Sequence, residues 1–275
     1  MKLTCGSYQL DLTRPRVMGI VNVTPDSFSD GGKFAISETA VQHGMELVGQ
    51  GADILDIGGE STRPGATPVP LEEELRRVIP VVEALASKAG VPISVDTYKP
   101  EVMKAAIAAG ASIINDVFAL TEPGALEAVA DSKVGVCLMH SQGTPQTMQL
   151  DPKYDDVVRE VRDFLQARIQ ACETHGITRD RILLDPGFGF GKRSVHNVAL
   201  LRELGVIGEL GQPILVGLSR KSVLGQLTGN DVDVRLHASL SAAVISAMKG
   251  AKIVRVHDVK ATVDALKVVT AVEGL

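Results

Sequence analysis

One unit recurs along the sequence: a short β-branched run, a polar or Gly-rich turn, and then a helical pattern of apolar residues. The runs occupy residues 17–21, 53–57, 92–96, 112–116, 135–139, 181–185, 213–217 and 252–256. No linker or change in composition interrupts these units. The repetition therefore predicts a single domain over residues 1–275 with a (β/α)8 barrel, the TIM-barrel form of an α/β protein.

The segments around the runs refine this prediction. Helical patterns cover residues 37–51, 71–90, 99–110, 122–131, 154–176, 235–250 and 259–272, with a weak one near 196–205. Leu3 to Leu12 are expected to form an N-terminal β-hairpin that covers the bottom of the barrel. A doubly wound open sheet is the alternative, because periodicity does not show whether the eighth strand pairs with the first.

Composition excludes several classes of function. The 275 residues are 45% apolar and 22% charged, which suits a sizeable core. A net charge of −5, no Trp and 3% aromatic residues argue against a nucleic-acid partner. Cys5, Cys137 and Cys172 lack the paired spacing of zinc or redox motifs, which favours a reducing cytoplasm. The sequence contains no signal-like segment, so export is not expected. It also contains no run of roughly 18 apolar residues, so a membrane partner is not expected.

The predicted strands end in polar residues with unusual regularity. For any one of them, the start of an ordinary turn is a sufficient explanation. The whole series is harder to explain in this way, because Asp and Asn are depleted in strands. The C-terminal ends of barrel strands converge, so the series predicts a polar pocket at this end. Its members are Asn22, Asp56, Asp96, Asn115 with Asp116, His140, Asp185, Ser219 and His257.

Basic residues follow the same strand ends in a mildly acidic chain. Arg255 and His257 are two apart and are expected to project from one face of their strand. Arg63, Arg220 and Lys221 lie in loops at the same end, although Arg220 alone is also explained as an ordinary surface residue. A group of cations at one mouth predicts an anionic ligand, and Arg side chains suit phosphate oxygens.

The ordered motifs resemble those of bacterial dihydropteroate synthase over nearly the whole chain. They are NVTPDSFSDGG, GGESTRPG, ISVDTYKPEV, IIND, LMHSQGTPQTMQ, DPGFGFGK, VGLSRKS and VRVHDV. The resemblance implies a transferase of folate biosynthesis (EC 2.5.1.15). In this reaction the amine of 4-aminobenzoate displaces diphosphate from (7,8-dihydropterin-6-yl)methyl diphosphate and gives 7,8-dihydropteroate. The resemblance also implies Mg²⁺, a homodimer and a sulfonamide target.

The resemblance further implies roles for individual residues. Asp96, Asp185, Lys221 and Arg255 are the expected catalytic residues, with Asp185 accepting hydrogen bonds from pterin N3 and the 2-amino group. Asn115 is expected to read the neighbouring pterin edge. The other expected substrate-binding residues are Phe28, Thr62, Arg63, Pro64, Met139, Phe190, Gly217, Ser222 and His257, and the expected Mg²⁺ ligand is Asn22.

The favoured mechanism begins with cleavage of the C–O bond to diphosphate. The resulting methylene cation delocalises into the dihydropterin, where Asp96 and Asp185 stabilise it by preorganised electrostatics. The neutral arylamine then attacks without a strong general base. Asp116 is expected to point away from the pterin and to stabilise its own loop. A pterin-dependent methyltransferase or a non-catalytic pterin-binding relative is the alternative.

Overall fold

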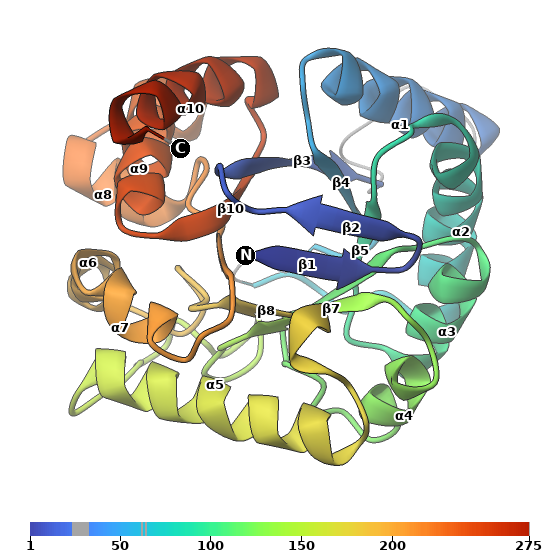
Figure 1. The fold of residues 1–275 in the computed structure, drawn as a ribbon, viewed down its shortest axis with the longest axis horizontal. Coiled ribbons are helices and arrows are strands. Elements are labelled where there is room, and N and C mark those ends of the chain that lie inside the picture. Colours follow the sequence, from blue (N-terminus) through green and yellow to red (C-terminus); the bar gives the residue numbers. More distant parts are fainter. Residues whose placement is uncertain (24–32, 62, 64, 275) are drawn as a thin grey trace.

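The strands form a closed barrel, in a computed structural model that describes residues 1–23, 33–61, 63 and 65–274. All neighbouring strands pair in parallel, in the order β10-β3-β4-β5-β6-β7-β8-β9 (Figure 1). Because β10 pairs with β3, the closed barrel is confirmed and the open sheet is excluded. The strands are β3 (Arg16–Asn22), β4 (Ile54–Gly58), β5 (Ile93–Asp96), β6 (Ile113–Asp116), β7 (Gly135–Met139), β8 (Ile182–Asp185), β9 (Ile214–Val216) and β10 (Ala251–Val256).

Helices surround the strands in Figure 1 and follow the predicted series with two differences. The weak pattern near 196–205 is divided between α6 and α7, and a short helix, α8, precedes α9. None of the helices in the described part of the chain is long and apolar enough to span a membrane. The helices are α1 (Lys33–Gly49), α2 (Leu71–Lys88), α3 (Pro100–Ala108), α4 (Ala125–Ala130), α5 (Val157–Thr174), α6 (Ser194–Arg202), α7 (Leu204–Gly208), α8 (Ser222–Thr228), α9 (Leu236–Met248) and α10 (Val259–Glu273).

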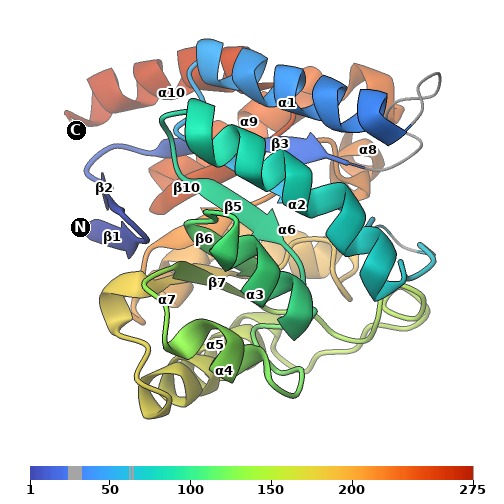
Figure 2. The ribbon, with the colours of Figure 1, turned by 90° about the vertical axis from the view of Figure 1, so that its right-hand side faces the viewer.

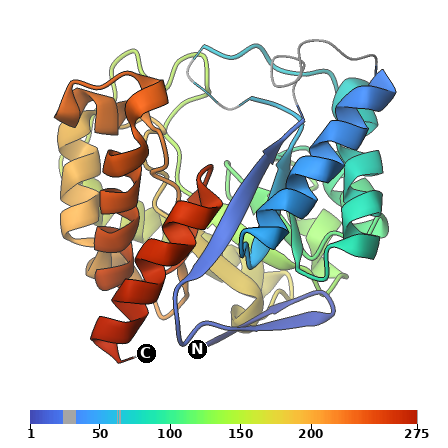
Figure 3. The same ribbon diagram turned by 90° about the horizontal axis from the view of Figure 1, so that it is seen from above.

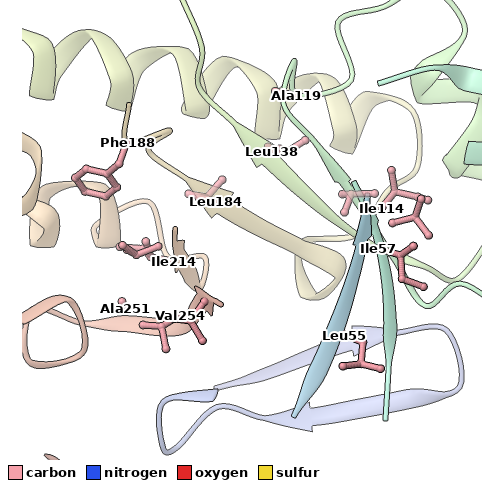
Figure 4. Close-up of a cluster of buried hydrophobic side chains, with 14 of the residues drawn as sticks. Leu55, Ile57, Ile114, Ala119, Leu138, Leu184, Phe188, Ile214, Ala251 and Val254 are labelled. Carbon is pink, nitrogen blue, oxygen red and sulfur yellow. The ribbon is translucent and has the colours of Figure 1, made fainter. Parts of the chain in front are cut away.

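Alternation along each strand produces two separate cores. Outward-facing residues such as Leu55, Ile114 and Leu184 pack between the strands and the helices (Figure 4). Inward-facing residues at the N-terminal ends of the strands form a second apolar cluster inside the barrel. The barrel members of this inner cluster are Met18, Ile54, Ile113, Cys137, Leu183, Leu215 and Ile253.

The predicted N-terminal hairpin covers the bottom of the barrel. Strands β1 (Lys2–Cys5) and β2 (Tyr8–Asp11) pair antiparallel. Leu3, Cys5 and Leu12 are fully buried in the inner cluster. Figure 3 shows the hairpin crossing one end of the barrel, opposite the ends at which the strands finish. The apolar contacts therefore close this end and leave the other for a site.

Candidate active site

Arg255 joins two carboxylates at the C-terminal end of the barrel. Its Nε donates to Asp56 Oδ2 at 2.5 Å and its Nη2 donates to Asp96 Oδ2 at 2.9 Å. The three residues come from β10, β4 and β5, and their formal charges sum to −1. Burial opposes the charge of Arg255, but the two carboxylates outweigh burial and raise the pKa of the guanidinium.

Asn115 belongs to the same network. Its Nδ2 donates to Asp56 Oδ2 at 3.3 Å, and the side chains of Asn115 and Asp96 are both almost fully buried. Burial raises the pKa of Asp96, Arg255 opposes the rise, and Asp56 adds to it. Asp56 was expected in the polar pocket but was given no role. Its contacts make it the shared partner of two predicted site residues.

Asp185 lies at the end of β8, near the half-buried Lys221. Its Oδ1 accepts a hydrogen bond from the Gly187 backbone N–H at 2.7 Å. Burial raises the pKa of Asp185, and the ammonium of Lys221 opposes this rise. Burial also lowers the pKa of Lys221 to about 8, against the attraction of Asp185. Each of the two groups therefore favours the charged form of the other.

Lys221 lies in the loop after β9, and the loop after β8 places the Phe190 ring beside it. Lys221 Nζ donates to the Phe188 carbonyl oxygen and lies 4.5 Å from the centroid of the Phe190 ring. The neighbouring Ser222 begins α8 and is exposed. A cation above an aromatic face holds both groups in place. The predicted residues Lys221, Phe190 and Ser222 thus lie at one side of the mouth.

Lys192 braces this loop from below and was missed by the sequence reasoning. Its Nζ donates to the carbonyl oxygens of Gly187 and Phe190 at 2.9 and 3.0 Å and lies 2.9 Å from His140 Nδ1. Burial lowers the pKa of Lys192 well below its ordinary value. Gly187 has φ +70°, and a Cβ there would lie 1.8 Å from the His140 carbonyl oxygen. The motif GFGFGK therefore makes a tightly folded support.

Two strand-end residues predicted in the polar pocket lie outside it. His140 packs against Phe164 of α5, with ring centroids 5.0 Å apart, and burial lowers its pKa to about 3. Asp116 accepts hydrogen bonds from the backbone N–H groups of Phe118 and Leu120 at 2.8 and 2.7 Å. Burial raises the pKa of Asp116 to about 7. Both follow inward-facing residues by one position and therefore face outward. For Asp116, the expectation of a loop-stabilising role is confirmed.

Two of the predicted cations do not offer a free charge. Arg220 forms an ion pair with Asp258, at 2.6 Å between Nη2 and Oδ1. Burial and the nearby Arg255 lower the pKa of His257 to about 4, so its imidazole is neutral at pH 7. Its Nδ1 lies 3.0 Å from Ser219 Oγ. Arg63 is exposed at the same end.

The remaining predicted residues border the network. Met139 is the register partner of Asp185, and a Cβ at Gly217 would lie 3.8 Å from Arg255 Cβ. Asn22 ends β3 next to Gly58. Among residues 1–23, 33–61, 63 and 65–274, no three His, Cys, Asp or Glu side chains could hold a metal ion together. Phe28, Thr62 and Pro64 lie outside the described residues.

A second, largely buried network anchors the base of the loop that follows β4. Lys99 Nζ forms ion pairs with Glu60 of this loop and with Glu74 of α2. The Thr97 hydroxyl donates to Glu74 Oε1 at 2.7 Å. Thr97 follows Asp96 directly, so this network fixes the chain on one side of the pocket.

The chain is similar to known proteins in both sequence and fold. The family described as "Pterin binding enzyme" matches residues 18–257. The dihydropteroate synthase of Escherichia coli K12 is 56% identical over 271 residues, which cover 98% of this chain and 96% of that protein. The solved dihydropteroate synthase of Xanthomonas albilineans with 4-aminobenzoic acid is 58% identical, with a TM-score of 0.94 and coverage of 100% and 98%. Its complex with 7,8-dihydropteroate gives a TM-score of 0.92 at 55% identity and covers 100% of both chains.

Proposed function

The chain belongs to the dihydropteroate synthases, transferases of EC 2.5.1.15, and we propose how its residues divide the work of this reaction. The reaction joins (7,8-dihydropterin-6-yl)methyl diphosphate to 4-aminobenzoate and releases diphosphate. The observation that carries the residue roles is the meeting of Asp56, Asp96, Asn115 and Arg255 in one buried network. These residues come from four strands, so only the closed barrel places them together.

Asp185 and Asn115 recognise the pterin edge. Asp185 uses one oxygen to accept the Gly187 N–H, which holds the carboxylate in one orientation. Its other acceptor positions are directed to pterin N3 and the 2-amino group, because a carboxylate accepts from adjacent N–H donors in pairs. Asn115 donates and accepts and reads the neighbouring edge. Lys221 reaches O4 and N5, while Met139 and Gly217 border the ring.

Asp96 and Asp185 stabilise the cation that forms when the C–O bond breaks. Both carboxylates are buried, and each has a cationic neighbour that favours its ionised form, Arg255 for Asp96 and Lys221 for Asp185. In a pocket of low polarity, fixed negative charge acts more strongly on a developing cation than it does in water. The arylamine attacks as a neutral nucleophile, so no residue has to remove a proton beforehand.

The diphosphate lies at the outer side of Arg255. Its neighbours are Arg63, His257 and Asn22, all at the C-terminal end of the barrel. Asn22 fits a Mg²⁺ site with a single protein oxygen, because Mg²⁺ usually keeps waters and takes its remaining ligands from phosphate. When bound there, Mg²⁺ stabilises the charge of the departing diphosphate. Arg255 orients the same group through the donors that Asp56 and Asp96 leave free.

The aminobenzoate is held at the mouth. Phe190 and Ser222 provide its inner side, and the contact of the Phe190 ring with Lys221 Nζ supports this role. Phe28, Thr62 and Pro64 are the remaining expected neighbours. A cytoplasmic location agrees with three cysteines that are all free and buried.

A homodimer through the α8, α9 and α10 side of the barrel accounts for the apolar residues exposed there. Ile245 and Met248 on α9 are 42% and 59% exposed, and Val268 and Val272 on α10 are 63% and 75% exposed. An apolar patch of this kind is typical of a subunit interface. Sedimentation should give a dimer, and Met248→Glu should shift it toward a monomer. A wild-type monomer at micromolar concentration would contradict this proposal.

The direct test is product formation. Purified protein is incubated with dihydropterin diphosphate, 4-aminobenzoate and Mg²⁺, and the products are identified by mass. We expect dihydropteroate and one diphosphate per turnover, and a strong loss of activity when Mg²⁺ is removed. Failure to release diphosphate would favour the pterin-dependent methyltransferase alternative.

A further inference from the structure

Asp56 is the most deeply buried charge of the pocket and has no place in the proposed chemistry. Its exposed fraction is 0%. Its register partners are Ile20 and Ser94, whereas Asp96 is aligned with Gly58, the next inward-facing position. Asp56 therefore lies one level below Asp96, on the floor of the pocket. Gly58 leaves the level above it without a side chain.

The bonds of Asp56 decide the orientation of Arg255. Asp56 Oδ2 accepts from Nε, so one edge of the guanidinium is held from the floor. Asp96 Oδ2 accepts from Nη2, but Asp96 also has to face the reacting pterin. A ligand that engages Asp96 leaves Asp56 as the anchor of Arg255. The Nη1 donors then stay directed to the diphosphate.

Asp56 also decides which atom of the Asn115 amide faces the pocket. An ionised carboxylate only accepts hydrogen bonds, so the amide must turn its Nδ2 toward Asp56. The carbonyl oxygen of Asn115 consequently points elsewhere. A neutral amide in place of Asp56 removes this preference, because it donates as readily as it accepts.

The floor also holds polar atoms that the fold alone leaves unsatisfied. Within the described residues, Asp56 Oδ1 and Ser94 Oγ are the buried side-chain oxygens without a hydrogen-bond partner. Leaving such atoms unpaired destabilises a folded protein. An apolar floor like the cluster one level below would avoid this loss of stability. The charge at Asp56 therefore calls for a functional explanation.

We propose that Asp56 is a positioning residue, which holds the guanidinium of Arg255 toward the diphosphate and the amide of Asn115 toward the pterin. The proposal rests on the roles given to Arg255 and Asn115 above. Asp56 acts through the side chains of Arg255 and Asn115 and makes no contact with the reacting atoms. Asp56 also places a second negative charge beside Asp96.

The variant Asp56→Asn removes the charge and keeps the shape. We expect kcat to fall about 100-fold, the loss typical of a misplaced catalytic group. The acid limb of the kcat/KM profile should also move to lower pH. Asp56 raises the pKa of Asp96, together with burial, Glu74 and Asp116, while Arg255 lowers it. Removal of the Asp56 charge lets Asp96 ionise at lower pH, an effect that a purely structural role would not produce.

Asp53→Asn is the matched control at the opposite end of the barrel. Asp53 accepts from Arg14 and Arg16 at 2.7 and 2.8 Å, so this variant also loses a carboxylate that is bound to arginine. It should lower thermal stability and leave the acid limb unchanged. Asp56→Glu provides a second test, because it keeps the charge but displaces it by one methylene. This variant should retain the acid limb of the wild type and lose kcat.

A double variant separates this inference from the roles on which it rests. In the Arg255→Ala background, Asp56→Asn should lower kcat by a smaller factor than it does in the wild type, because only the part that acts through Asn115 remains and the buried charge no longer has its Arg255 partner. Losses that multiply, an unmoved acid limb in Asp56→Asn, or full activity of Asp56→Glu would each overturn the proposal. Normal binding of diphosphate by Arg255→Ala alone would instead refute the role of Arg255.

Discussion

The two ends of the barrel are built from the same eight strands and have opposite characters. At the N-terminal end, the inward-facing side chains are apolar and pack against residues of the β1–β2 hairpin. Figure 2 shows this hairpin at one end of the barrel. At the C-terminal end, the inward-facing residues include Asp56, Asp96, Asn115, Asp185 and Arg255, all wholly or largely buried. On β4 the two layers occupy consecutive inward-facing positions, Ile54 and Asp56.

This difference separates the residues that stabilise the fold from the residues that carry the function. Burial of the lower layer stabilises the fold by removing apolar surface from water. Burial is unfavourable for the upper layer, since it raises the pKa values of Asp96 and Asp185, and two polar oxygens of this layer lack partners in the part of the chain that the structure describes. We therefore expect substitutions at the lower end to change stability and substitutions at the upper end to change binding and rate.

The largest expected effect is on stability, in Leu3→Ala. Leu3 is fully buried in the inner cluster and lies in the hairpin, far from the pocket. Its truncation should lower the free energy of unfolding by about 2 to 5 kcal/mol, because a cavity remains. Urea unfolding measures this change. Met45→Ala on the surface of α1 should change stability by less than about 0.5 kcal/mol. A lower kcat for the folded Leu3→Ala protein would break the comparison.

The next effect is on pterin binding, in Asp185→Asn. The amide presents an N–H group where the pterin also presents N–H groups. Binding should weaken by roughly 2 to 4 kcal/mol, because polar groups are left unpaired in a buried site. Calorimetry with the pterin measures the change, and urea unfolding serves as the control for the fold. Unchanged pterin affinity would show that Asp185 does not bind this edge.

A somewhat smaller and more selective effect is expected for Arg255→Ala. The loss should weaken the diphosphate-bearing substrate by about 1.5 to 3 kcal/mol, the range for a hydrogen bond to a charged group. The free hydroxymethyl pterin should be affected far less. Titration of both ligands into both proteins distinguishes the cases. Equal weakening would make Arg255 a wall of the pterin pocket and no diphosphate ligand.

The smallest effect is proton uptake by His257. Its pKa of about 4 makes it neutral at pH 7, and bound diphosphate favours the charged form and raises this pKa. At pH values between the pKa of His257 in the free protein and its higher pKa in the complex, binding of diphosphate takes up less than one proton. The affinity for diphosphate therefore increases as pH falls. Calorimetry in two buffers of different ionisation enthalpy measures the uptake. His257→Gln should remove the contribution of the protein, and equal uptake in both proteins would exclude His257 as its source.

Residues near the strand ends show how far local patterns reach. Alternation places Asp96, Asp185 and Arg255 inside the barrel, and all three lie there. The same rule places Asp116 and His140 outside, although their polarity suggested the pocket. The alternation of inward-facing and outward-facing positions can be read from the sequence, and it indicates the orientation of these two residues better than their polarity does.

Other features depended on partners that are distant along the chain. From its sequence position at the end of a Gly-rich loop, Lys192 would be expected to face solvent. Its amine is instead enclosed by carbonyl oxygens of its own loop and by His140. Lys99 joins Glu60 to Glu74 in the same way. Helix α8 has no clear periodicity over its seven residues, so the pattern of βα units passed over it.

By itself, the sequence determined the eight βα units, the hairpin, the ordered motifs and the face on which each strand residue lies. These properties follow from local backbone geometry and from the period of apolar residues, which act over a few positions. The tertiary structure alone decided which charges meet. Asp56 and Arg255 are 199 residues apart in sequence, and closure of the barrel brings Nε to 2.5 Å from the carboxylate. Burial at that point sets the pKa values, because water is replaced by the few groups that the closed barrel places beside each charge.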